Sequence, residues 1–425
     1  MDQQKPAPHE ETLTRGALRI PRWEFIALCA ALMAVNALAV DVMLPGLQEI
    51  GASLGVENEN HRQYVIPAYI FGFGVAQLFF GPLSDRFGRR PPLVAGLIIY
   101  IVAAAAAAVA PTFALLLACR LVQGVGAAAT RVIAVSIVRD TFEGRRMAEV
   151  MSLIFMVFMA VPIVAPSVGQ FVMLFASWHF IFVVMAAGAL AVLGLMWLRL
   201  PETLHPEYRR PFTLDAVLKG FAIVLTNRVA LCYTLASTFI FAAMFGFITS
   251  SQQIYVGLYG VGELFPLIFA GMAGVIAISN FANSRLVGRI GMRRLSHSAL
   301  LAFLAISLIW LTLSLAGPIP LWLFIIIYCC AMVPFAMLGS NFNALAMEPL
   351  GAIAGTASSV LGFMQTFVGG VLGTAIGQAY DGTVMPLAAS FCLVTAAALV
   401  AVLVAERGRL FQAHNPPITP GGFSE

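Results

Sequence analysis

Three ionisable side chains lie inside long apolar stretches of this 425-residue sequence: Asp41, Arg120 and Arg131. A charge at the centre of a bilayer costs at least about 2.5–3.5 kcal/mol on insertion scales, so such a residue usually faces a cavity or a partner. An aspartate in this setting can exchange a proton, because desolvation raises its pKa and a neighbouring guanidinium lowers it. A static buried ion pair is the alternative interpretation.

The depths of these residues bear on whether they meet. Asp41 and Arg120 lie about five and seven residues from the outer ends of their segments, roughly 7–11 Å below the outer boundary at 1.5 Å per residue. They can therefore pair if the two helices adjoin. Arg131 follows Arg120 by about three turns of helix, so both arginines face one way, as in the wall of a cavity. Snorkelling of Arg131 toward the inner surface is the alternative.

The elements that position these residues are long and apolar. The chain is 60% hydrophobic and 10% charged, whereas soluble domains carry about 25% charged residues. A spanning helix needs roughly 20 mostly apolar residues, and the apolar runs do not alternate as in a membrane β-barrel. The sequence predicts an all-α membrane protein with twelve transmembrane helices, at 24–46, 62–82, 92–111, 113–137, 148–172, 178–198, 229–250, 263–284, 297–316, 320–345, 353–378 and 385–405.

Charge and loop length predict the orientation and the domains. Most of the 24 basic residues fall in alternate loops and in both tails, which the positive-inside rule places in the cytoplasm. The longest polar connection lies between two sets of six spans, as in two-bundle transporters. We expect a cytoplasmic N-terminal tail, an N-terminal six-helix bundle, a cytoplasmic central loop, a C-terminal six-helix bundle and a cytoplasmic C-terminal tail, at 1–22, 23–198, 199–228, 229–405 and 406–425.

The corner at 81–90, GPLSDRFGRR, joins the second and third spans. Gly81 and Gly88 suit a tight link that needs unusual φ, and its arginines hold the loop inside by charge. Topology does not explain Asp85, because acids contribute little to it. A faint echo, GRIGMRR at 288–294, follows at an offset of 203 residues, with glycine in place of the acid.

Here the sequence resembles a known family. The pattern G-x-x-x-D-R-x-G-R-R looks like the loop signature of the major facilitator superfamily, and its matching residues are Gly81, Asp85, Arg86, Gly88, Arg89 and Arg90. The resemblance implies that this corner gates the cytoplasmic face between two bundles, with Arg86 and Arg89 as partners of Asp85. The partner across the interface would be the N-terminus of the helix near 351–359, since helix N-termini favour a carboxylate.

Further motifs are similar to drug:proton antiporters of the bicyclomycin/chloramphenicol-resistance type. AVDVMLPGLQEIGASLGV at 39–56, LPETL at 200–204 and 343–363 match that subfamily, and RLVQG at 120–124 resembles its helix 4 signature. This implies that Asp41 and Arg120 serve proton coupling. VPIVAPSVGQ at 161–170 resembles the antiporter motif, in which Pro162, Pro166 and Gly169 shape a bend. The departures are Gln170 for the usual glycine, Val135 for an arginine and His179 for an arginine.

A substrate cavity is expected where polar, aromatic and methionine side chains meet inside the spans. Aromatic and methionine surfaces can repack around varied apolar ligands. Core or lipid-facing packing is the alternative for the apolar members, and hydrogen bonding between helices is the alternative for the asparagine. The candidates are Arg131, Gln123, Met156, Phe245, Gln365 and Asn341.

These features together indicate a proton-coupled exporter of small, largely apolar drugs in a bacterial inner membrane. We expect a multi-pass monomer. We also expect no cofactor and no drive by ATP, because the sequence contains no G-x-x-x-x-G-K-[ST] loop that would bind ATP. Its partners are a drug or metabolite, protons and membrane lipid. No metal-ligand set and no clustered basic face for nucleic acid is visible. A metabolite exporter or an importer on the same fold is the alternative, and a membrane enzyme or receptor is a more distant one.

Overall fold

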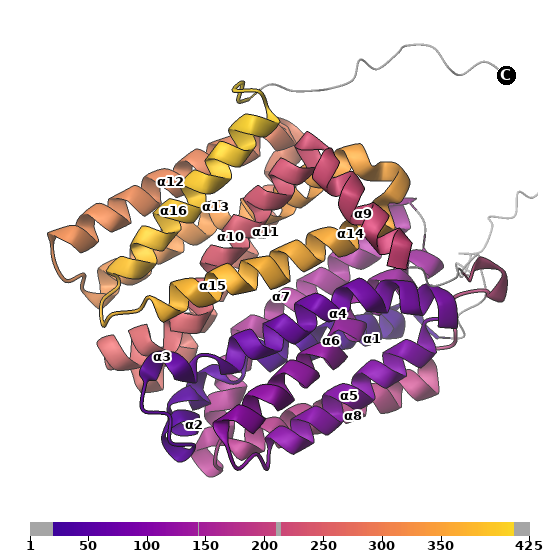
Figure 1. The fold of residues 1–425 in the computed structure, drawn as a ribbon, viewed down its shortest axis with the longest axis horizontal. Helices are drawn as coiled ribbons and strands as arrows, with labels where there is room; N and C mark the ends of the chain where they lie inside the picture. Colours follow the sequence, from indigo (N-terminus) through magenta and orange to yellow (C-terminus); the bar gives the residue numbers. More distant parts are fainter. Residues whose placement is uncertain (1–19, 143, 210–213, 412–425) are drawn as a thin grey trace, which may run out of the picture. The chain divides into compact units, whose positions relative to one another are not determined.

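The computed structural model describes residues 20–142, 144–209 and 214–411, apart from some side chains, and every regular element in this part is a helix (Figure 1). Most of these helices are long and apolar, as the sequence predicts. The first half contains α1 (Arg22–Asp41), α2 (Leu47–Ser53), α3 (Glu59–Arg62), α4 (Val65–Phe87), α5 (Arg90–Ala107), α6 (Phe113–Thr141), α7 (Gly144–Phe175) and α8 (His179–Arg199). The second half contains α9 (Leu214–Thr226), α10 (Arg228–Gln252), α11 (Phe265–Ile290), α12 (Met292–Ala316), α13 (Leu321–Met347), α14 (Ala354–Phe363), α15 (Gly369–Gln378) and α16 (Met385–Ala405).

Eleven stretches of the described chain are long and apolar enough to cross a membrane. The helix α7 contains a shorter apolar stretch, Ala160–Phe175. The protein is therefore an all-helical, multi-pass membrane protein. The count of twelve spans and the cytoplasmic side of both termini stay predictions.

The chain divides into two compact units. Unit 1 comprises Met1–Leu218 and Thr249–Ala273, and unit 2 comprises Lys219–Ile248 and Gly274–Glu425. The sequence places the whole of 229–405 in one bundle, so the grouping of 249–273 with unit 1 is a difference. It has a polar cause within unit 1, because the amide of Gln253 accepts from Gln63 and donates to Asn60 at 2.7 Å.

Within unit 1, α6 packs closely against α4 and α5 (Figure 1). Glycines permit this approach. A methyl group on Gly124 would lie 2.0 Å from the carbonyl oxygen of Tyr69 in α4, and one on Gly72 would lie 2.0 Å from the carbonyl oxygen of Leu121. On the other side, Gly126 meets the backbone of α5, since its methyl would lie 2.5 Å from the carbonyl oxygen of Gly96. The helix that carries both membrane arginines is thus held on two sides by backbone contact.

We expect Gly124→Ala to destabilise the protein. The added methyl must push α4 away from α6, and overpacking of this kind costs about 1–3 kcal/mol. The measurement is the thermal unfolding temperature and yield of the purified protein in detergent. Gly188→Ala is the matched control, because nothing lies within 4 Å of a methyl group there. Equal unfolding temperatures for the two variants would contradict this packing.

The two short corners predicted from the sequence echo have the same backbone form. Gly88 follows α4 with φ +93°, and Gly291 follows α11 with φ +88°, a region that favours glycine. The expectation of unusual φ at Gly81 is wrong. The helix α4 continues through Gly81 to Phe87, and the Gly81 carbonyl accepts a hydrogen bond from the Ser84 hydroxyl at 2.8 Å.

Candidate functional site

Asp41 is the last residue of α1 and is 5% exposed. Within the part of the chain that the structure describes, its carboxyl group takes part in no ion pair and no side-chain hydrogen bond. Burying a charge without a partner is costly, so such a group favours its neutral form. This position therefore holds an acid whose protonation is not fixed by a protein cation.

Arg120 lies fully buried in α6, and its guanidinium binds no carboxylate of the residues that the structure describes. The Nη2 group donates to the carbonyl oxygen of Ala39 at 2.9 Å, Nε donates to the carbonyl oxygen of Val65 at 3.2 Å, and Nη1 donates to Oε1 of Gln123 at 2.7 Å. The possible pairing of Arg120 with Asp41 is thus not formed. The last four carbonyls of a helix lack intrahelical partners, and Arg120 satisfies one of them two residues before Asp41.

Aromatic rings complete the surroundings of this guanidinium. The Tyr69 ring lies 4.5 Å from Cζ of Arg120, and the Phe182 ring lies 6.0 Å away. Ring faces attract a cation, more so when it is desolvated. The C-terminal end of a helix also favours positive charge. The end of α1 therefore stabilises the charge of Arg120 without an ion pair to the nearby Asp41. The Gln123 amide is occupied as well, because its Nε2 donates to the Met185 sulfur at 3.5 Å.

The helix α7 passes close to the end of α1. A methyl group on Gly169 would lie 2.1 Å from the carbonyl oxygen of Val42, so only glycine fits this contact. Pro162 and Pro166 lie within α7, which continues through both. The bend expected at these prolines stays a prediction, and the Met156 side chain lies outside the described residues.

Arg131 differs from Arg120 in its contacts. Its side chain is partly buried and its guanidinium lies over the ring of Phe73, 6.0 Å from the centroid. Over the described part of the chain it has no hydrogen bond and no ion pair. The structure thus separates a satisfied arginine from an unsatisfied one on the same helix.

The candidate residues of unit 2 form neutral polar contacts. Gln365 donates to the Ser237 hydroxyl and to Oδ1 of Asn343, both at 2.6 Å. Asn341 donates to Oδ1 of Asn283 at 2.9 Å. These bonds join neighbouring helices, which is the alternative noted for Asn341 in the sequence. Phe245 is 8% exposed, and a methyl group on Gly373 would meet its Cβ at 2.5 Å, so Phe245 packs against a backbone.

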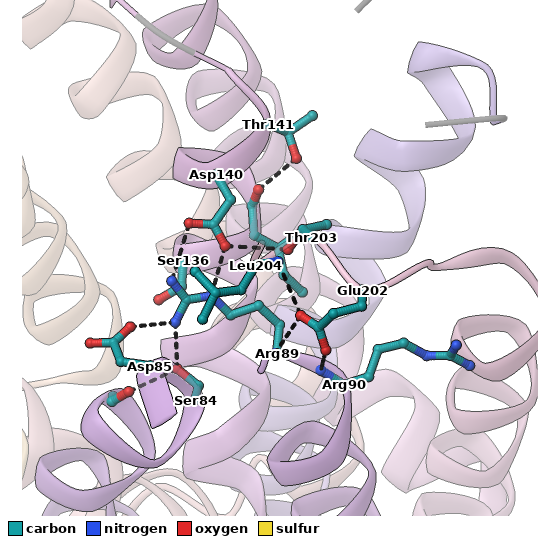
Figure 2. A network of polar contacts seen from close by, with 12 residues as sticks. Ser84, Asp85, Arg89, Arg90, Ser136, Asp140, Thr141, Glu202, Thr203 and Leu204 are labelled. Atoms are coloured by element: carbon teal, nitrogen blue, oxygen red, sulfur yellow. Dashed lines mark hydrogen bonds and ion pairs between the residues drawn. The ribbon is translucent and has the colours of Figure 1, made fainter. Parts of the chain in front are cut away.

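The corner after α4 is a network centred on Arg89, which is drawn in Figure 2. Its guanidinium binds Asp140 through Nε at 2.7 Å and Nη2 at 3.1 Å, and binds Asp85 through Nη1 at 2.5 Å. Burial lowers the pKa of Arg89, but the hydrogen bonds and charges of Asp140 and Asp85 outweigh it, and the net direction is upward. The cation at this corner is therefore permanent.

Glu202 closes the same corner from the chain that follows α8. Its carboxylate accepts from the backbone N–H of Arg89 at 2.7 Å and of Arg90 at 3.0 Å. A methyl group on Gly88 would lie 2.6 Å from this carboxylate, which is a second reason for glycine there. Arg90 turns away and donates to the carbonyl oxygen of Trp197 at 2.9 Å. Exposed Arg86 lies with its Cζ 5.1 Å from the Phe87 ring centroid, and among the described residues it has no hydrogen bond and no ion pair.

Sequence reasoning missed Asp140 and Glu202 as members of this corner. The usable signal is that both are acids at span ends that the sequence predicts to be cytoplasmic, where the positive-inside rule gives acids no role. The expected contact of Asp85 with 351–359 stays a prediction, because the side chains of residues 351–356 lie outside the described set. The contact of Asp85 that the structure gives is with Arg89.

Unit 2 repeats the arrangement at its own corner. Arg293, just after Gly291, donates to Glu348 at 2.7 Å and to Glu406 at 3.0 Å. These acids follow α13 and α16, much as Asp140 and Glu202 lie at the ends of α6 and α8. The counterpart of Asp85 is Gly288, so the repeated corner lacks the exposed acid.

Comparison with known proteins places these features in a family. A model of the Major Facilitator Superfamily matches residues 25–374. The chain is 31% identical to a bicyclomycin resistance protein homolog of Haemophilus influenzae, over 85% of this chain and 91% of that protein. It is 32% identical to the multidrug resistance protein MdtL of Escherichia coli, over 80% of this chain and 85% of that protein. Among solved structures, a D-xylose-proton symporter matches with a TM-score of 0.68 at 12% identity, covering 90% of this chain and 97% of that one.

Proposed function

The chain belongs to the major facilitator superfamily, and from this premise we propose that it exports small drugs in exchange for protons by alternating access. The relatives at 31–32% identity carry names of bicyclomycin and multidrug resistance. Drug export is therefore the cargo class that we assign. The cell is bacterial and the membrane is its inner membrane, consistent with these relatives.

The observation that supports proton coupling is the buried carboxyl group of Asp41, which has no ion pair within the described chain, beside the satisfied guanidinium of Arg120. An acid held in an ion pair by Arg120 would keep its charge. Without that pair, Asp41 is free to bind a proton from one side and release it to the other. The fixed charge of Arg120, nearby on α6, favours release when the site meets water.

The coupling has a defined energetic scale. Moving one elementary charge through the membrane potential is worth about 2.3 kcal/mol per 100 mV. An exporter that admits one proton for each drug molecule gains that amount for every cycle, in addition to the pH gradient. No nucleotide is needed in such a cycle.

The test of this function uses the wild-type protein in sealed proteoliposomes and in an efflux-deficient bacterial host. In proteoliposomes, an imposed pH gradient should drive accumulation of a fluorescent drug, and addition of the drug should release a measurable proton flux. In the host, expression should raise the inhibitory concentration for several antibiotics. Resistance without proton flux removes the coupling, and proton flux elicited only by metabolites assigns the protein to metabolite export.

At the cytoplasmic corner, we expect Asp85→Asn to slow transport and to change stability little. The Asp85 side chain is 48% exposed, so water screens its ion pair with Arg89. Loss of this ion pair therefore costs at most about 1 kcal/mol of stability. Asp140→Asn is the comparison, because Asp140 is 13% exposed and makes two bonds to Arg89. It should lower the unfolding temperature more. Normal transport by Asp85→Asn at normal expression contradicts a gating role.

A further inference from the structure

Arg131 has no counter-charge in the part of the chain that the structure describes. The acids of unit 1 that form ion pairs lie near the ends of its helices and pair with other arginines. Asp41 lies near the level of Arg120, which is about 16 Å from Arg131 along α6 at 1.5 Å per residue. The ion pairs in question are Asp85 and Asp140 with Arg89, Glu149 with Arg22, Glu24 with Arg199 and Glu59 with Arg62. A cation is thus left inside the membrane part of unit 1.

The direction of the side chain argues against snorkelling. Side chains on a helix tilt toward its N-terminus, and the N-terminus of α6 is the end far from the corner that contains Asp140. The backbone nitrogen of Phe73 lies beside Gly124 of α6, because a methyl group on Gly124 would be 2.9 Å from it. Gly124 precedes Arg131 by seven residues, roughly 10 Å along α6 at 1.5 Å per residue. The ring beneath the guanidinium is therefore deeper than the Arg131 backbone. The side chain points into the membrane part and away from the surface to which it would snorkel.

The chemistry that remains at Arg131 selects an anion. Guanidinium carries five N–H donors in a planar fork, and the Phe73 ring 6.0 Å from Cζ of Arg131 accepts no conventional hydrogen bond from them. The edges of the fork are left for a ligand. A carboxylate matches this edge with two parallel hydrogen bonds, which lysine cannot reproduce. Arg120 shows the contrast, because all three of its nitrogens are already bound.

We propose that Arg131 is an anion-binding site for the substrate, so that the transported compounds include small amphipathic molecules with a carboxylate and an apolar ring system. The Phe73 ring supplies an apolar surface beside the charge. This inference rests on the proposed function, whose cargo it narrows from apolar drugs to drugs that carry a negative group.

The experiment is equilibrium binding to the delipidated, detergent-purified protein by isothermal titration calorimetry, with 2-naphthoate and its neutral analogue 2-naphthamide. We expect the wild type to bind naphthoate at least about tenfold more tightly than the amide, since a charge-assisted bidentate contact is lost with the amide. Arg131→Gln should abolish this preference. Arg139→Gln is the matched control, because Arg139 is exposed on the same helix.

Folding is separated from binding by a second measurement. Arg131 loses no hydrogen bond or ion pair of the described chain when replaced, so Arg131→Gln should unfold at the same temperature as the wild type or higher. An unfolding temperature well below that of the wild type gives Arg131 a structural role and overturns the proposal. Equal binding of naphthoate and naphthamide by the wild type also overturns it.

A lipid phosphate offers the same chemistry from a different source. Phosphatidylglycerol added to the micelles should not displace naphthoate, and if it does while phosphatidylcholine does not, a lipid is the occupant and the substrate assignment falls. Binding at equilibrium needs no proton gradient, so a failure of proton coupling leaves this measurement intact. Proton-driven export of neutral drugs with no preference for naphthoate would retain the proposed function and remove this inference.

Discussion

Asp41→Asn should reduce the steady-state drug gradient that the protein maintains by about fiftyfold at 100 mV. One proton charge is worth about 2.3 kcal/mol at this potential, and each 1.4 kcal/mol is a factor of ten. The amide of asparagine occupies the same volume but cannot exchange a proton. Proteoliposomes with a potassium-valinomycin potential and a fluorescent drug measure the gradient directly. Exchange of labelled for unlabelled drug without a gradient should persist, because binding and alternation do not require the proton.

The matched control for this substitution is Asp381→Asn. Asp381 is an exposed acid in a loop, where Oδ1 accepts from Thr383, and asparagine retains that acceptor. It should maintain the wild-type gradient. If Asp41→Asn also maintains it, the proton is carried elsewhere. If Asp41→Asn loses both the gradient and the exchange, its acid serves binding rather than coupling.

Arg120→Lys should abolish transport and lower stability, although it keeps the positive charge. An ammonium group on a single stem cannot reach the carbonyl oxygens of Ala39 and Val65 and the amide of Gln123 together. At least one buried acceptor is then left unmet, at a cost of about 1–3 kcal/mol. The measurements are the unfolding temperature in detergent and gradient-driven transport in proteoliposomes.

The same replacement at an exposed position of α6, Arg139→Lys, controls for the loss of a guanidinium as such. Transport by Arg120→Lys at the wild-type rate would mean that only the charge matters there. An unfolding temperature equal to that of the wild type would mean that the hydrogen bonds to α1 and α4 contribute little. Either result contradicts the role that the geometry gives to Arg120.

The sequence was sufficient for the membrane class, the family and the position of most helices. Length and hydropathy determine a spanning segment almost by themselves, because lipid requires satisfied backbone groups over a fixed thickness. The corner after α4 was also located, because Gly88 and the basic residues around it indicate a tight link between two spans. The expectation of unusual φ at Gly81 was wrong, because α4 continues past the predicted end of this span at residue 82 to Phe87.

The contacts of individual side chains were beyond sequence reasoning. Hydropathy places Asp41 and Arg120 at similar depth, but similar depth does not determine which atoms the Arg120 guanidinium binds. A pattern of residue types cannot predict that a side chain will bind the backbone carbonyls at the end of α1. Asp140 and Glu202 were missed for a related reason. They lie 51 and 113 residues from Arg89 in sequence, and only the folded chain brings them to it.

A single uninterrupted helix carries Arg120, Arg131 and Asp140, and glycine-to-carbonyl contacts hold it on two sides. Its first and last charges are roughly 30 Å apart along the axis. Packed protein has low compressibility. A shift of α6 near Arg120, beside the helix end that carries Asp41, is therefore transmitted to the end with Asp140 as a rigid displacement. The stiffness of the middle of α6, rather than any further charge, then determines how much of a displacement at one end of the helix reaches the other end.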